Sequence, residues 1–256
     1  MKGRIFLLII LLILTAGSCA GEKAEQTAAE GSPGEEIVSE NYNKDGIEAE
    51  YPRLISGGTQ EERDRINNLI YADFNKILQI YSFNPFPELT PSPAVSVPTI
   101  LNIRYVIKQN SDELISILYS AAFNSPYSAH PTDLVYTTNI DKKNQTRLKL
   151  PDIIKINEAF VRDFRTWDFI VPEGSNEELN KAIRDYFTGM TDEDYLMGFQ
   201  NADIIGSGNL WGIYSYLTPD RLGISISVPN YIGDHIEFER EYGKLKDYLK
   251  LDFTKE

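Results

Sequence analysis

The sequence predicts an α+β protein with a mainly antiparallel sheet and helices packed on it. Three observations predict this class. Segments with helical spacing of apolar residues follow capping signals, other segments alternate apolar and polar residues at period two, and short polar turns join the alternating segments in pairs. About 210 residues after an N-terminal leader and tether fit one compact domain, or two intimately packed halves.

The first expected helix begins at a capping box, Thr-x-x-Glu at 59–62, in which two side chains satisfy two free backbone amides. Apolar residues then recur at helical spacing. They are Ile66, Leu69, Ile70, Phe74, Ile77, Leu78 and Tyr81. Five prolines between residues 84 and 98 exclude a helix or a central strand there, so this stretch is expected to be a surface connection.

Further helices are expected in the second half of the chain. A helical stretch is expected after Pro151, and capping signals at 175–178 and 191–194 each precede apolar residues at helical spacing. A closing helix is expected over 242–249. Helices therefore cluster between two groups of strands.

The expected strands alternate apolar and polar residues and are bounded by turn residues. They span 101–107, 115–123, 134–140, 146–150, 211–217, 222–228 and 236–238. Neighbouring segments are separated by short polar turns, which favour antiparallel hairpins.

The N-terminus reads as the signal peptide of an exported protein. Lys2 and Arg4 precede an apolar run over 5–14, which is too short to span a membrane. Small residues then precede Cys19, the only cysteine of the chain, and this ending resembles the lipobox of bacterial lipoproteins. The resemblance implies lipidation at Cys19, a signal peptide over 1–19, and a protein anchored to the bacterial cell membrane facing outside the cytoplasm. An ordinary signal peptide with an incidental cysteine is the alternative.

The region over 20–46 is rich in Glu, Ala, Gly and Ser, without apolar periodicity, so it is expected to be a flexible acidic tether before a domain over 47–256. Removal of residues 1–19 takes away Lys2 and Arg4 and no acidic residue, so the net charge of −13 becomes −15. This charge argues against nucleic-acid binding and would steer cationic partners toward the protein. The alternative is that it merely keeps an exported protein soluble.

Three patches along the chain resemble one family of extracellular domains. They are residues 51–55 with the helix over 66–70, Ser128-Ala129-His130 with 148–154, and 216–222 with 233–245. Ser128 stands where the family has glycine. The family comprises RsiV-type lysozyme-sensing anti-sigma factors and the non-catalytic region of PdaC-type peptidoglycan deacetylases. The resemblance implies a non-catalytic binding domain whose partner is a lysozyme-like protein or the cell wall.

No local motif predicts catalysis, a cofactor or a metal site. His130 and His235 are far apart in sequence and have no ligand spacing, and Gly206-Ser207-Gly208 is interpreted as a turn. Aromatic residues and a histidine in or beside expected loops are the candidates for partner binding. They are Tyr127, His130, Tyr136, Trp211 and Tyr231. The alternatives are a histidine that hydrogen-bonds its own loop and aromatic rings that pack within the loops.

Two other functions remain open from the sequence. One is an envelope enzyme that acts on peptidoglycan or another glycan through paired carboxylates, which the 38 acidic residues supply without identifying. The other is a structural lipoprotein that assembles with further envelope proteins.

Overall fold

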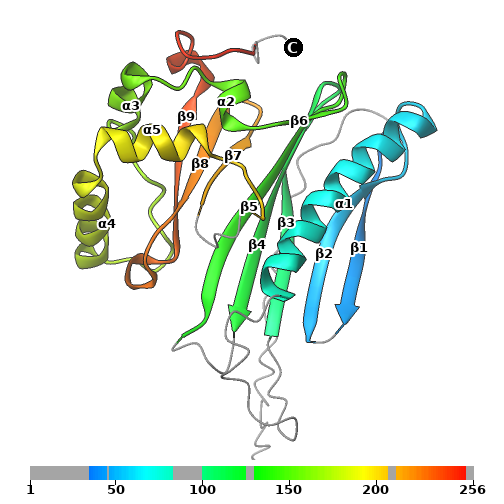
Figure 1. Ribbon diagram of the computed structural model, residues 1–256, viewed down its shortest axis with the longest axis horizontal. Coiled ribbons are helices and arrows are strands. Elements are labelled where there is room, and N and C mark those ends of the chain that lie inside the picture. The colour runs from blue at the N-terminus through cyan, green and yellow to red at the C-terminus, as the bar shows by residue number, and fades with distance from the viewer. Residues whose placement is uncertain (1–34, 45, 83–99, 125–129, 207–211, 252–256) are drawn as a thin grey trace, which may run out of the picture.

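The computed structural model describes residues 35–44, 46–82, 100–124, 130–206 and 212–251. Two sheets form the framework of one compact body, a six-stranded sheet ordered β1-β2-β3-β4-β5-β6 and a three-stranded sheet ordered β7-β8-β9 (Figure 1). A long helix lies along the larger sheet, and shorter helices gather beside the smaller one. The α+β class is therefore confirmed.

The larger sheet is antiparallel except between β2 and β3. Its strands are β1 (Ile37–Lys44), β2 (Ile47–Leu54), β3 (Ile100–Asn110), β4 (Leu114–Asn124), β5 (Thr132–Asp141) and β6 (Thr146–Leu148). A parallel pair needs a crossover connection, and helix α1 (Gln60–Ser82) lies in that connection. The hairpins β3–β4 and β5–β6 follow the predicted pairing.

Helix α1 begins as its capping box predicts. The Thr59 amide donates to Glu62 Oε2 at 2.7 Å, and the Glu62 amide donates to Thr59 Oγ1 at 3.2 Å. The helix buries one apolar stripe against the larger sheet, where each such side chain contributes roughly 1.5–3 kcal/mol. The buried stripe consists of Ile66, Ile70, Phe74, Ile77 and Leu78.

The smaller sheet is covered by helices that follow the larger sheet in sequence. The elements are α2 (Leu150–Ile153), α3 (Glu158–Phe164), α4 (Glu177–Gly189), α5 (Asp192–Gln200), β7 (Ile213–Leu217), β8 (Arg221–Ser227), η2 (Asn230–Ile232), β9 (His235–Glu241) and η3 (Tyr242–Lys244). Their core is aromatic: the Phe164 ring lies 4.9 Å from the rings of Phe199 and Phe238. The two sheets thus have separate apolar cores.

The expected tether boundary at residue 46 is wrong. Strand β1 lies inside the expected tether and pairs along its whole length with β2. Just before it, Glu35 Oε2 accepts from the buried Lys142 Nζ at 2.6 Å. Strand β1 is a mostly polar edge strand, so its place in the sheet depends on backbone pairing and this ion pair, which leave little periodicity in the sequence.

Two helix predictions also need correction. Helix α4 is capped by Asn176 Oδ1, which accepts from the Leu179 amide at 2.8 Å, and not by Ser175. The closing helix is reduced to the single turn η3, because the chain after it runs back beside α2, where the Lys155 amide donates to the Tyr248 carbonyl at 2.8 Å. The capping box at Thr191 and Asp194 is confirmed.

Candidate functional site

Two of the predicted partner-binding residues belong to segments that lie together in the fold. His130 immediately precedes β5, and Tyr231 lies in η2, about a hundred residues later. Asn230 Nδ2 donates to the Pro131 carbonyl at 3.4 Å, and the Asp133 amide donates to Asp234 Oδ2 at 3.0 Å. We call residues 130–133 and 229–235 the Tyr231 platform.

Tyr231 is the most exposed large hydrophobic side chain among the described residues, at 72% of its full accessibility. The turn beneath it is held in place. Gly233 has φ of 111°, a conformation that glycine adopts without steric cost. The buried Asp234 carboxylate accepts from Asn230 Nδ2 at 3.2 Å as well as from Asp133. The platform therefore presents an aromatic ring to solvent on an ordered support.

The other candidates do not join this site. Tyr136 is fully buried, its hydroxyl lies 3.0 Å from the Tyr81 hydroxyl, and its ring packs edge-on against Tyr214. The prediction that Tyr136 binds a partner is therefore wrong, because β5 is covered on both faces. Tyr127, Trp211 and Cys19 lie outside the described residues. His130 is exposed, and its Nδ1 lies 3.2 Å from the Pro131 carbonyl, which is the loop contact of the alternative interpretation.

His235, the last residue of the platform, connects the two sheets. Its Nδ1 lies 3.1 Å from the Asp133 carbonyl of β5, and its Nε2 lies 3.7 Å from Glu237 Oε1. Burial disfavours the charged imidazolium, but the Glu237 carboxylate and the Asp133 carbonyl outweigh burial and raise the pKa of His235. Burial likewise opposes the charged form of Glu237, and hydrogen bonds from His235 and Tyr216 outweigh it and lower the pKa of Glu237.

The Tyr216 hydroxyl lies within hydrogen-bonding distance of two carboxylates, those of Glu237 and Glu239. Its hydroxyl lies 2.8 Å from Glu237 Oε2 and 2.9 Å from Glu239 Oε1, so its one proton serves one carboxylate at a time. Lys108 Nζ lies 4.4 Å from the centroid of the Tyr216 ring. The expected strand over 236–238 contained a signal for this cluster, since His235, Glu237 and Glu239 alternate and must share one face.

Glu237 and Glu239, which we call the carboxylate cluster, meet at the Tyr216 hydroxyl, and a pair of carboxylates is one requirement of a glycan-cleaving enzyme. Such enzymes also need one carboxylic acid that stays protonated near neutral pH. The pKa of Glu237 is shifted in the opposite direction, below its usual value. Among residues 35–44, 46–82, 100–124, 130–206 and 212–251, no three His, Cys, Asp or Glu side chains lie together as metal ligands.

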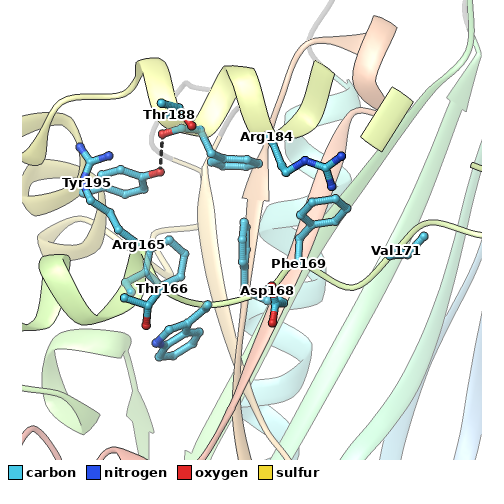
Figure 2. A pocket seen from close by; sticks show the side chains of 12 residues that line it. Arg165, Thr166, Asp168, Phe169, Val171, Arg184, Thr188 and Tyr195 are labelled. Atoms are coloured by element: carbon cyan, nitrogen blue, oxygen red, sulfur yellow. Dashed lines mark hydrogen bonds between the residues drawn. The ribbon is translucent and has the colours of Figure 1, made fainter. Parts of the chain in front are cut away.

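A pocket of about 540 Å³ opens beside the smaller sheet (Figure 2). It lies between the segment that follows α3, the helix α4, and β9. Its lining, which we call the aromatic pocket, consists of Phe164, Arg165, Thr166, Trp167, Asp168, Phe169, Val171, Arg184, Phe187, Thr188, Tyr195 and Phe238. Nothing in the sequence marked this set, because its members come from four segments without a shared motif.

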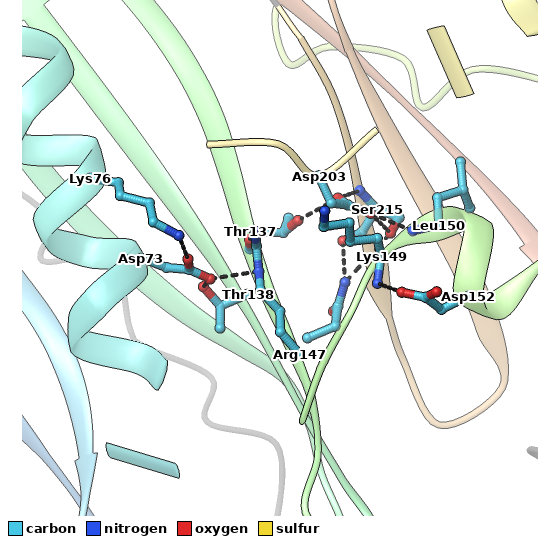
Figure 3. A network of polar contacts seen from close by, with 11 residues as sticks. Asp73, Lys76, Thr137, Thr138, Arg147, Lys149, Leu150, Asp152, Asp203 and Ser215 are labelled. Atoms are coloured by element: carbon cyan, nitrogen blue, oxygen red, sulfur yellow. Dashed lines mark hydrogen bonds and ion pairs between the residues drawn. The ribbon is translucent and has the colours of Figure 1, made fainter. Parts of the chain in front are cut away.

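A third cluster, the polar seam, joins the two sheets (Figure 3). The fully buried Asp203 accepts through Oδ1 from the Ser215 amide at 2.6 Å and from Thr137 Oγ1 at 3.1 Å. Its Oδ2 accepts from the Leu150 amide and from Ser215 Oγ, both at 2.7 Å. Burial raises the pKa of Asp203, and these hydrogen bonds oppose the rise. Because every acceptor direction is occupied within the protein, we interpret the seam as structural.

Comparison with family models gives no match, and comparison with curated proteins gives none. Among solved structures, the chain is similar to a member of the DUF3298 family from Bacteroides fragilis NCTC 9343, with 14% identity, 85% of this chain and 94% of that chain covered, and a TM-score of 0.49. It is also similar to a DUF3298 family protein from Pseudomonas aeruginosa PAO1, with 14% identity, coverage of 86% and 95%, and a TM-score of 0.46. These likenesses assign no activity or partner to the chain, so function is argued from its own residues.

Proposed function

We propose that this protein is an exported, lipid-anchored bacterial surface protein whose folded domain binds an extracellular protein without catalysing a reaction. The partner is a cationic protein of the lysozyme-like class, and the Tyr231 platform is its contact surface. The observation that carries the proposal is the exposure of Tyr231 on a turn held by buried hydrogen bonds.

A preordered aromatic ring is well suited to protein recognition. Tyrosine offers a large contact area and a hydroxyl, and it is enriched among the few residues that dominate binding energies. The turn is already fixed through Asn230, Gly233 and Asp234, so association does not have to order it. The expected contribution of Tyr231 is therefore that of an interface anchor.

The acidic charge supports a cationic partner. The net charge of −15 that remains once residues 1–19 are removed would raise the association rate of a basic protein. Salt would screen this attraction, because the Debye length is about 8 Å at physiological ionic strength. Membrane attachment is assigned to Cys19. Among the described residues, no helix is both long and apolar enough to cross a membrane.

The test is calorimetric titration of the full chain, purified in detergent, with a basic lysozyme at low and moderate salt. We expect one-to-one binding that weakens with salt and that Tyr231→Ala weakens by about 2 kcal/mol or more. Tyr71→Ala is the matched control, because Tyr71 is an exposed tyrosine on α1, in the other half of the molecule. Absence of heat at both salt concentrations, or equal effects of the two substitutions, would contradict the proposal.

The lipid anchor is tested separately by metabolic labelling with radioactive palmitate. We expect label in the wild-type protein and none in Cys19→Ala, which should also be released from the membrane fraction. Label that persists in Cys19→Ala would contradict anchoring at this residue. The result does not depend on the partner at the Tyr231 platform.

The carboxylate cluster supports one rival function, hydrolysis of a cell-wall glycan by Glu237 and Glu239. Its test is the release of reducing ends from peptidoglycan, with Glu237→Gln compared against Glu173→Gln, an exposed glutamate in the segment before α4. Turnover that only Glu237→Gln abolishes would favour the enzyme over the binding protein.

A further inference from the structure

The aromatic pocket has the size and construction of a small-molecule site. Its volume of about 540 Å³ lies within the roughly 300–1,000 Å³ typical of ligand pockets. Three of its rings pack together: the Phe238 ring lies 5.0 Å from Phe187, edge to face, and 4.9 Å from Phe164, at a tilted angle. All three residues are buried, so their rings form a fixed apolar floor.

One of the two arginines that line the pocket is already committed to the fold. Arg165 Nε donates to Asp192 Oδ1 at 2.7 Å, and Arg165 Nη2 donates to the Met190 carbonyl at 2.6 Å. Its guanidinium also lies 4.9 Å from the centroid of the Tyr195 ring. Arg165 therefore fastens the start of α5 to the end of α3, and its charge is neutralised.

The other two charged side chains of the lining have no polar partner within the part of the chain that the structure describes. Arg184 on α4 and Asp168 after α3 are both exposed, and neither makes an ion pair or a hydrogen bond within the part of the chain that the structure describes. Figure 2 shows them on either side of the Phe169 ring. The lining thus presents one free positive charge and one free negative charge beside an apolar floor.

We propose that the aromatic pocket binds a zwitterionic small molecule, namely an apolar amino acid or a dipeptide of such residues. Arg184 receives the carboxylate, because its planar fork can donate two parallel hydrogen bonds. Asp168 accepts the ammonium, and the apolar side chain covers the floor of Phe164, Phe187 and Phe238. A ligand of this class satisfies both free charges at once, whereas an anion or a cation satisfies only one of them.

The site is independent of the proposed protein partner. The pocket lining contains no residue of the Tyr231 platform. Tyr231→Ala should therefore leave small-molecule binding unchanged, and Arg184→Gln should leave lysozyme binding unchanged. Failure of either proposal can be recognised without reference to the other.

The experiment is calorimetric titration of the full chain in detergent with phenylalanine and with alanylphenylalanine. N-acetylphenylalanine, which has no ammonium, and phenethylamine, which has no carboxylate, are the truncated probes. We expect each truncated probe to bind at least about tenfold more weakly than phenylalanine, because each leaves one charge-assisted hydrogen-bonding group unused.

The variants assign each charge to its group. Arg184→Gln should weaken phenylalanine by about tenfold or more and leave phenethylamine unchanged, since that probe has no carboxylate to lose. Asp168→Asn should weaken phenylalanine similarly and leave N-acetylphenylalanine unchanged. Arg162→Gln is the matched control, because Arg162 is an exposed arginine on α3 outside the lining, and it should change nothing.

Two results would overturn the proposal. One is no binding of phenylalanine or alanylphenylalanine up to about 10 mM, a concentration at which even a millimolar site would be filled. The other is binding that Arg184→Gln and Asp168→Asn leave as in the wild type. Both substitutions replace exposed side chains, so circular dichroism and thermal unfolding should confirm that the variants stay folded.

Discussion

The two halves of this molecule are held together internally by apolar packing and joined to each other by polar contacts as well. The first half, residues 37–148, packs α1 on the larger sheet around one apolar cluster, and the second, 149–251, packs helices on the smaller sheet around another, with only a few residues of each cluster coming from the other half. Between them, Asp203, Thr137 and Ser215 are completely buried and hydrogen-bonded. Apolar packing builds each half and also crosses between them in the cluster of Leu118, Val135 and Tyr216, while Asp203 Oδ1 accepts from both β5 and β7 and so links the two sheets by hydrogen bonds.

The first half also contains a buried aspartate, Asp73, whose hydrogen-bond donors differ in kind from those of Asp203. Asp73 on α1 accepts from Lys76 Nζ at 3.1 Å and Thr138 Oγ1 at 3.0 Å, and its Oδ2 lies 2.7 Å from Arg147 Nε (Figure 3). All of these donors are side chains, which can move. Two of the donors to Asp203 are backbone amides, which cannot move without disturbing β7 or α2.

The largest expected effect is that of Asp203→Ala. The substitution leaves the amides of Leu150 and Ser215 buried without an acceptor, so the free energy of unfolding should fall by about 3 to 5 kcal/mol. Urea unfolding measures it. Asp168→Ala, which removes an exposed aspartate, should stay within about 0.5 kcal/mol of the wild type. A loss for Asp203→Ala as small as that of the control would show that the hydrogen bonds of the seam do not stabilise the fold.

The second-largest loss of stability is expected for Gly223→Ala, which tests how Tyr216 packs on the face of the smaller sheet. An added Cβ at Gly223 would overlap the Tyr216 ring, which crosses β8 at that position to reach Glu237 and Glu239. We expect a loss of about 1 to 3 kcal/mol in thermal or urea unfolding. Gly243→Ala is the control, since an added Cβ there meets nothing within 4 Å. In a Tyr216→Ala background the cost should largely disappear, and an unchanged cost would refute the overlap.

A smaller loss is expected for Tyr136→Phe, inside the first half. The substitution keeps the buried ring but removes its hydroxyl, which lies 3.0 Å from the Tyr81 hydroxyl, so the free energy of unfolding should fall by about 1 kcal/mol. Partner binding should be unaffected, because Tyr136 is inside the core. Tyr71→Phe, at an exposed site, should cost almost nothing. Loss of partner binding without loss of stability would restore Tyr136 as a recognition residue.

The smallest effect is a dependence of stability on pH through His235. Its pKa is raised in the folded state, so the protonated ring stabilises the fold fully below the unfolded value of about 6.5, and this contribution is lost as the pH rises through the folded pKa. The wild type should therefore lose some stability as the pH rises above the unfolded value of about 6.5. His235→Gln should show a flatter profile in urea unfolding. Identical slopes would show that the contacts of His235 with Glu237 and Asp133 do not stabilise the charged ring.

Much of the fold could be predicted from local signals. The capping boxes of α1 and α5 and the period-two strands β3, β4 and β5 are encoded within a few residues each, so they appear where the sequence places them. Strand β1 could not be predicted from apolar periodicity, because it is a mostly polar edge strand. It is held by backbone pairing with its neighbour β2 and by the ion pair of Glu35 with Lys142, which is distant in sequence. The prediction of a closing helix is wrong, because the backbone of residues 248–250 hydrogen-bonds to residues 153–155 and does not continue a helix.

For the candidate site, turn signals in the sequence indicate which residue types stand in or near loops, and His130 and Tyr231 are among them. The packing of the whole chain brings the segments of these two residues together, buries Tyr136, and places His235, Glu237 and Tyr216 in one cluster. The aromatic pocket likewise exists only where four segments converge. The physical reason is that periodicity and caps act over one turn or one hairpin, whereas burial and docking depend on the packing of the whole chain.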